Sequence, residues 1–393
     1  MAVATTVTDF ATQVQPGVWK QLKVLAASGN IANGYIFTGP AGTGKEGTAL
    51  SFAALLNCTA TREKPCGTCS SCRRFNTLQH EHLTLVYPLP GGTGPAGDTS
   101  DPLERLSDAD LEILTRALEK KAQDPFYRIQ LPRANRIPIQ FIRHLRHKIY
   151  LKSAEPGFKI IILFAAHTLS AGSGEAANAL LKLLEEPPAD TTLILVTDQR
   201  DVLLPTILSR CQLISFPPLT MAAITRHLGT DTSQPVDLAA YLSGGDINAA
   251  RRLAAQPEND MVENLLAMVR FFMAANMKEQ RAMLGELVRL VRSEPDVFRQ
   301  TVTALQFWFS LLQKTGAGLP LPKFSAPLQP SLTATAARYP KANVPDIIIT
   351  LEELKQAPQQ NLHPELALTG AVVHIRRYLS GLNRYAISRQ LAP

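Results

Sequence analysis

The chain has 393 residues, of which 45% are hydrophobic and 19% charged, and these values are typical of a folded protein with two or three domains. Its formal net charge of +7 permits contact with nucleic acid or acidic partners but requires neither. No apolar run reaches the roughly 18 residues of a membrane span, and residues 1–17 lack the pattern of a secretion signal, so we expect a cytoplasmic protein without a membrane partner.

Short apolar runs alternate with helical patterns through about the first 220 residues. The runs are rich in Ile, Val, Leu and Thr, and they occupy residues 33–39, 82–88, 158–164, 191–197 and 211–216. Such runs suit parallel strands that are covered by helices on both faces. The pattern predicts an α/β doubly wound domain over residues 1–218, with ligand sites at the carboxyl ends of its strands.

Strand patterns stop at Pro218, and only helical patterns follow. Three short helical patterns predict a small helical lid over residues 219–256, and longer ones predict an all-α C-terminal domain over residues 257–393. Residues 89–123 combine a stretch rich in Gly and Pro with a helical pattern, and they are interpreted as an insertion with no assigned role.

The stretch FTGPAGTGKEGTA, residues 37–49, has the composition of a phosphate-binding loop between a strand and a helix. In such a loop, glycines let backbone N–H groups converge on an anion, and the candidates are Gly39, Gly42 and Gly44. Lys45 would reach the outer phosphates. The next residue is Glu46, where the pattern normally has a Ser or Thr whose hydroxyl binds Mg²⁺. We therefore predict a degenerate nucleotide site.

The end of the third apolar run lacks the acids that ATP hydrolysis needs. Phosphoryl transfer requires an acidic residue on a neighbouring strand to hold Mg²⁺, but Phe164 and Ala165 follow the run here. His167, slightly further on, does not replace carboxylates, because Mg²⁺ prefers hard oxygen ligands. We expect that the loop can hold ATP or ADP but that this chain alone does not hydrolyse it.

Four of the five cysteines fall within fifteen positions, in NCTATREKPCGTCSSC. Four thiolates are the ligand set of structural Zn²⁺, so we predict a zinc module over residues 58–72, with the ligands Cys58, Cys66, Cys69 and Cys72. The run C-x₂-C-x₂-C is also found in iron–sulfur proteins, and reduced thiols on a loop are the plainer alternative. His80 and His82 lie nearby, but four cysteines already complete the site.

Two long stretches, residues 21–58 and 174–219, resemble the clamp-loader subunits of bacterial DNA polymerase III. The resemblance covers about the first 250 residues and includes the cysteines between the two stretches. It is strongest to the delta-prime family, a relative of the gamma/tau ATPase family. It implies an AAA+ fold, a lid and a helical collar that assembles with gamma/tau-type and delta-type subunits. Such an assembly opens the sliding clamp and places it on primer–template DNA.

The resemblance also implies roles for single residues. Arg210, in the triplet Ser-Arg-Cys, matches an arginine finger that acts in trans on the ATP of a neighbouring subunit. Thr197 matches the first sensor residue of the nucleotide site. Asn248 stands where an active lid carries an arginine. The loss of this arginine and of the acids favours a delta-prime-like subunit over a gamma/tau-like one.

Two alternatives remain open from the sequence. One is an active gamma/tau-like ATPase in which Glu46 holds Mg²⁺ and an acid from elsewhere acts as base. The other is a stand-alone zinc-containing DNA-binding protein, for which the basic helical stretch at residues 143–148 would be a DNA-contacting face.

Overall fold

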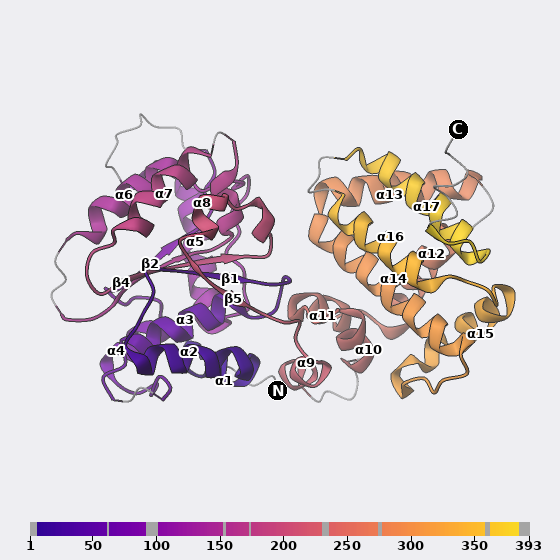
Figure 1. The fold of residues 1–393 in the computed structure, drawn as a ribbon, viewed down its shortest axis with the longest axis horizontal. Coiled ribbons are helices and arrows are strands. Elements are labelled where there is room, and N and C mark those ends of the chain that lie inside the picture. Colours follow the sequence, from indigo (N-terminus) through magenta and orange to yellow (C-terminus); the bar gives the residue numbers. More distant parts are fainter. Residues whose placement is uncertain are drawn as a thin grey trace. The chain divides into compact units, whose positions relative to one another are not determined.

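The computed structural model describes residues 6–60, 63–91, 101–151, 155–172, 174–229, 236–273, 277–357 and 362–384. The chain divides into two compact units, residues 2–219 and residues 220–393, which are drawn in Figure 1. Most of the Gly- and Pro-rich part of the predicted insertion, residues 92–100, lies outside the described residues.

The first unit is built on a five-stranded sheet in the order β2-β3-β4-β1-β5, and every neighbouring pair is parallel. Thr38, the last residue of β1, pairs with Thr197 of β4 and with Ser215 of β5. The carboxyl ends of these strands therefore meet at one edge. The strands are β1 (Gly34–Thr38), β2 (Leu83–Val86), β3 (Lys159–Leu163), β4 (Thr191–Thr197) and β5 (Gln212–Ser215).

Helices cover both faces of this sheet, with α2 and α3 on one side and α6 and α7 on the other (Figure 1). This cover explains the continuous apolar runs of β3 and β4, and it confirms the predicted parallel α/β fold. The helices of this unit are α1 (Val7–Val14), α2 (Pro16–Ser28), α3 (Lys45–Leu56), α4 (Ser70–Asn76), α5 (Asp108–Gln123), α6 (Ile139–Ile149), α7 (Glu175–Glu185) and α8 (Pro205–Leu208). Short 3₁₀ turns are Pro102–Arg105, Ala166–Ser170 and Arg200–Val202.

Helix α5 has clear sequence signals at its beginning. The Ser107 hydroxyl accepts a hydrogen bond from the backbone N–H of Asp110 and so caps the helix. Asp108 and Asp110 in the first turn and Lys120 and Lys121 in the last turn complement the helix dipole. The helical part of the predicted insertion therefore folds as an ordinary, well-capped helix.

Helix α1 was not anticipated from the sequence, and it packs on the phosphate loop. Its buried face is formed by Val7, Phe10, Ala11 and Val14. A methyl group added at Gly47 would lie only 2.4 Å from the Phe10 ring, and one at Gly44 would lie 2.8 Å from Val14. The glycines after the loop therefore allow close approach of α1 as well as the loop conformation.

The second unit is helical, which confirms the prediction of a helical C-terminal part. Trp308 and Phe309 are fully buried in a core that includes residues from α10, α12, α14, α16 and α17. The helices are α9 (Met221–Leu228), α10 (Val236–Leu242), α11 (Ile247–Ala254), α12 (Glu258–Met273), α13 (Met277–Ser293), α14 (Pro295–Gly316), α15 (Gln329–Arg338), α16 (Val344–Gln356) and α17 (Pro364–Leu379), with a 3₁₀ turn at Lys323–Leu328. Among the described residues, no helix is both long and apolar enough to cross a membrane.

Candidate functional site

The predicted phosphate loop joins β1 to α3 at the carboxyl edge of the sheet, where α/β folds bind ligands. Its three candidate glycines, Gly39, Gly42 and Gly44, all have positive φ angles, of 150°, 66° and 84°. A methyl group at Gly39 would lie 2.2 Å from the carbonyl oxygen of Phe216. The glycines are therefore required by the backbone geometry of the loop.

Lys45 is buried and bonded to the loop itself. Its Nζ donates to the carbonyl oxygen of Gly39 at 2.8 Å and to that of Pro40, and the Thr43 hydroxyl lies at 3.5 Å. Only 7% of the surface of Lys45 is exposed to solvent. The ammonium that was predicted to reach the phosphates thus contacts the carbonyl oxygens of the loop.

Glu46, in the first turn of α3, forms an ion pair that sequence reasoning missed. Its carboxylate accepts a hydrogen bond from Lys121, which lies in the last turn of α5, 75 residues further along the chain. Lys121 also donates to the carbonyl oxygens of Pro125 at 2.9 Å and Tyr127 at 2.6 Å. Glu46 therefore faces an ammonium group at the position where a hydroxyl would face Mg²⁺.

The strand ends beside the loop carry polar side chains that bond to one another. The His167 ring Nδ1 lies 3.1 Å from the Thr197 hydroxyl, which also accepts from the backbone N–H of Gln199 at 3.0 Å. Asp198, just after β4, lies 3.6 Å from His167 and 3.7 Å from the guanidinium of Arg128. Phe164, which directly follows β3, is buried and has no oxygen ligand to offer. Asp198 has the oxygen atoms that Mg²⁺ prefers, but its carboxylate already lies beside His167 and Arg128, and no acid directly follows β3.

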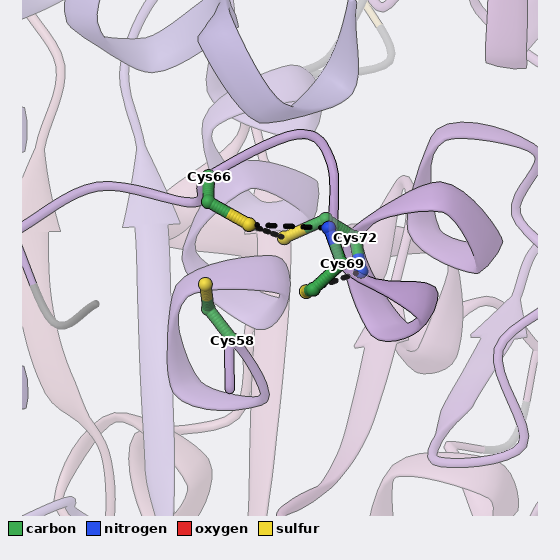
Figure 2. A group of neighbouring side chains, drawn as sticks. All are labelled: Cys58, Cys66, Cys69 and Cys72. Carbon is green, nitrogen blue, oxygen red and sulfur yellow. Dashed lines mark hydrogen bonds between the residues drawn. The ribbon is translucent and has the colours of Figure 1, made fainter. Parts of the chain in front are cut away.

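The four predicted zinc ligands are brought together by the fold. Their sulfur atoms all lie within 4.8 Å of one another, and Figure 2 shows Cys58 after helix α3 opposite Cys66, Cys69 and Cys72 around the start of α4. The Cys66 and Cys72 sulfurs are 3.9 Å apart. A regular tetrahedron of sulfurs around Zn²⁺ has edges of about 3.8 Å. The donor set and its spacing fit a tetrahedral metal ion.

Hydrogen bonds favour thiolates at two of these positions. The pKa of Cys66 is lowered to about 5 by the Thr68 hydroxyl and by backbone N–H groups, including that of Cys69 at 3.3 Å. Burial opposes a lowered pKa at Cys69, but backbone N–H bonds outweigh it, including the one from Cys72 at 3.4 Å. Burial raises the pKa of Cys72 well above its usual range. A cation at the centre would stabilise all four as thiolates.

The nearby histidines do not complete the cluster. The His80 ring lies 3.0 Å from the Ser71 hydroxyl through Nε2, and its Nδ1 accepts from the backbone N–H of His82 at 3.1 Å. His80 also stacks on Phe75. Both nitrogens of His80 are thus engaged away from the sulfurs, and the described cluster consists of the cysteines.

Arg210 lies between α8 and β5, and its guanidinium is exposed. Nε donates to one carboxylate oxygen of Glu185 at 2.9 Å, Nη2 lies 2.7 Å from the same oxygen, and Nη1 donates to the carbonyl oxygen of Thr206 at 3.0 Å. The Arg210 side chain keeps 36% of its exposure and that of Glu185 keeps 46%. Sequence reasoning interpreted Glu185 only as a helix terminus, whereas it is the ion-pair partner of this arginine.

The remaining candidate residues lie on helices. The basic stretch at residues 143–148 lies on α6, where Arg146, His147 and Lys148 are exposed and Leu145 is buried. Asn248 lies in the first turn of α11 in the second unit, where its backbone N–H bonds to the capping carboxylate of Asp246 at 2.8 Å.

The fold and the loop define a phosphate-loop-type α/β domain that is followed by a helical unit. Comparison with known proteins identifies the family within this class. The family model described as "DNA polymerase III, delta subunit" matches residues 14–220, and the chain belongs to this family. This confirms the resemblance to a delta-prime-like clamp-loader subunit that the sequence blocks indicated.

Individual relatives agree with this assignment. The chain is 28% identical over 270 residues to DNA polymerase III subunit delta' of Bacillus subtilis, covering 69% of this chain and 68% of the relative. It is 30% identical over 247 residues to subunit delta' of Pseudomonas aeruginosa, covering 62% and 61%. Subunit gamma/tau of Mycobacterium tuberculosis is 27% identical over 238 residues, covering 59% of this chain but only 33% of the relative.

Similarity to solved structures is weaker. A DNA polymerase III gamma subunit-related protein from Thermotoga maritima aligns with 92% of this chain and 99% of its own, at 14% identity and a TM-score of 0.33.

Proposed function

We propose that this chain is a non-hydrolysing, delta-prime-like subunit of a DNA polymerase III clamp loader. Its partners would be gamma/tau-type and delta-type subunits, and the assembly would load a sliding clamp on primer–template DNA. The observation that carries the non-hydrolysing part is the absence of an acid after β3 together with the Glu46–Lys121 ion pair. In this role the first unit is the AAA+ domain, residues 219–256 are a lid, and residues 257–393 are a collar that assembles in the cytoplasm with the other subunits.

We further propose that Arg210 is an arginine finger for the ATP of a neighbouring subunit. A guanidinium stabilises the charge that develops on the transferred phosphoryl group, and a neighbouring subunit can supply it in trans. Two observations support this role. The Arg210 side chain is exposed, and its partner Glu185 is exposed as well, so the ion pair between them costs little to break. A triphosphate could take the place of the Glu185 carboxylate without breaking any buried contact.

The cysteine cluster would hold a structural Zn²⁺. The support is the close approach of four sulfurs and the lowered pKa of Cys66 and Cys69. Four protein ligands leave no open position for substrate, so the ion would stabilise the connection between α3 and α4 rather than act in catalysis.

Reconstitution tests this function directly. The chain is mixed with gamma/tau-type and delta-type subunits of the same organism, and assembly and DNA-stimulated ATP turnover are measured with and without it. The proposal predicts that the complete mixture forms one complex, and that its turnover depends on this chain. Failure to assemble, combined with tight and salt-sensitive DNA binding by the isolated chain, would instead favour the stand-alone DNA-binding alternative. The active-ATPase alternative predicts turnover by the isolated chain.

A further inference from the structure

The segment from α5 to the strand ends, residues 108–128 and here called the α5 segment, overlaps the predicted insertion at residues 89–123, to which the sequence assigned no role. It places a fully buried lysine at the phosphate loop. Lys121 has 0% exposure, and its ammonium group is bonded to Glu46 of the loop helix. A lysine is almost never fully buried unless it is paired, and the partner of Lys121 is Glu46.

The surroundings of Lys121 specify the charged form. Three acceptors surround Nζ, namely the Glu46 carboxylate and the carbonyl oxygens of Pro125 and Tyr127. Only an ammonium group offers three donors and no acceptor. Burial lowers the pKa of Lys121, and the Glu46 carboxylate opposes this shift. The three bonds satisfy the group completely, so it has no donor left for a ligand.

The location of this ammonium matters as much as its bonds. Glu46 stands where relatives that hydrolyse ATP offer a hydroxyl to Mg²⁺, and Phe164 stands where they offer an acid. The Lys121 Nζ lies 5.1 Å from the centroid of the Phe164 ring, a cation–π distance, while it is bonded to Glu46. The ammonium therefore lies between the two positions that would otherwise hold the divalent cation.

The rest of the α5 segment closes over the same edge of the sheet. The Phe126 ring meets the Phe10 ring edge-on at 4.7 Å, and Phe10 in turn covers Gly47 of the loop helix. Arg128 reaches Asp198 just after β4, at 3.7 Å. The segment thus contacts the loop helix, helix α1 and the end of β4.

From these contacts we propose that the α5 segment is a built-in replacement for the metal ion, with the Lys121 ammonium neutralising Glu46 and holding the phosphate loop without magnesium. The loop then keeps its conformation in the isolated chain with no nucleotide bound. Of the described carboxylates at this edge, Glu46 is paired with Lys121, and Asp198 lies 3.7 Å from Arg128 and 3.6 Å from His167. This inference rests on the non-hydrolysing part of the proposed function, which uses the same ion pair, and it does not involve Arg210.

A double-mutant cycle on the full-length chain tests the ion pair. Lys121→Met removes the charge at similar length, and Glu46→Gln removes the carboxylate at similar shape. Lys121→Met should lower the midpoint of thermal unfolding by about 5 to 10 °C, because it leaves the Glu46 carboxylate, whose side chain is 17% exposed, without its partner. The double variant should regain at least about half of that loss, since neither charge remains.

The matched control is an exposed ion pair on the same helix, Arg116 with Glu112, whose side chains keep 69% and 65% exposure. Arg116→Met should shift the midpoint by no more than about 2 °C. If Lys121→Met does not fold while the double variant does, the result supports the pairing in its strongest form. A Lys121→Met midpoint equal to that of the control, additive effects in the cycle, or failure of both variants to fold would overturn the proposal.

The second measurement concerns the metal. The midpoint of the wild-type chain should be the same in millimolar ATP with and without magnesium, because a ligand stabilises only by binding the folded form. A magnesium-dependent rise of the wild-type midpoint would overturn the proposal. Either failure would leave the role of Arg210 untouched, since that role is measured on the ATP turnover of the neighbouring subunit.

Discussion

The Glu46–Lys121 and Arg210–Glu185 ion pairs of the first unit have similar chemistry but opposite surroundings. In the first, the side-chain exposures are 17% and 0%, and the lysine has two further carbonyl partners. In the second, both side chains are more than a third exposed. Breaking a buried pair by removing one partner costs about 3 to 5 kcal/mol, whereas an exposed pair contributes about 0 to 1 kcal/mol.

Because of this difference, the Glu46–Lys121 pair is closed to new ligands, whereas Arg210 is available to one. The buried pair fixes a cation beside the phosphate loop and leaves no donor for a new ligand. The exposed pair costs little to exchange, so Arg210 can leave Glu185 for a more strongly charged partner such as a triphosphate. The same domain thus carries one site that is satisfied internally and one arginine that remains available to a neighbour.

Removing the available arginine should have the largest effect. Arg210→Ala is expected to slow ATP hydrolysis at the adjoining site of the reconstituted complex by about 10³-fold, because an arginine finger stabilises charge in the transition state. The measurement is single-turnover hydrolysis in the assembled complex. Assembly itself should be unchanged, since the side chain makes only exposed contacts in this chain.

Arg116→Ala is the control for this experiment, because Arg116 is also exposed and paired but lies on α5. It should leave the rate within about twofold of wild type. A rate for the Arg210 variant as high as that of this control would remove the trans-acting role while leaving the family assignment intact.

Loss of the metal should have the next largest effect, and it should act on stability rather than rate. Elemental analysis of protein purified without chelator should find about one zinc per chain. Cys66→Ser should abolish that stoichiometry and lower the unfolding midpoint by roughly 10 °C, because metal binding contributes to folding.

Cys211→Ser provides the matched control, since Cys211 lies outside the cluster and should leave the zinc content unchanged. Absence of zinc from the wild-type protein, or an unchanged zinc content in the Cys66 variant, would contradict the metal site.

The smallest effect is expected at Glu185. Glu185→Gln weakens the resting partner of Arg210, so it should lower the free energy of unfolding by less than about 1 kcal/mol. It should raise hydrolysis at the adjoining site by at most about fivefold, because the arginine no longer breaks an ion pair to reach the phosphates. Chemical denaturation and single-turnover hydrolysis measure the two effects. If Glu185→Gln lowered the hydrolysis rate as much as Arg210→Ala does, Glu185 would be required to orient Arg210 towards the phosphates, and it would not be only the resting partner of the arginine.

The sequence predicted the framework of this fold well, because the central strands β1, β3 and β4 are almost wholly buried and are rich in apolar residues. It also predicted the cysteine cluster, since those ligands are close in sequence as well as in space. Helix α1 was missed although Val7, Phe10, Ala11 and Val14 repeat with helical spacing, a signal that eight residues make weak.

The two ion pairs could not be predicted in the same way. Lys121 follows Glu46 by 75 positions. The helical pattern of α5 alone predicts that Lys121, in its last turn, is exposed, whereas the side chain is buried. Glu185 lies 25 positions before Arg210, in a run of two glutamates where only the fold decides which one faces the arginine. Contacts of this kind depend on tertiary packing, which local periodicity does not contain.

Magnesium-dependent ATP turnover by the purified chain alone tests the central claim most directly, with Lys45→Ala as the comparison. We predict no steady turnover above background for the wild type, and no difference between it and the variant, because no acid follows β3 and Glu46 is already paired with Lys121. Steady hydrolysis that requires magnesium and disappears in the Lys45 variant would contradict the account.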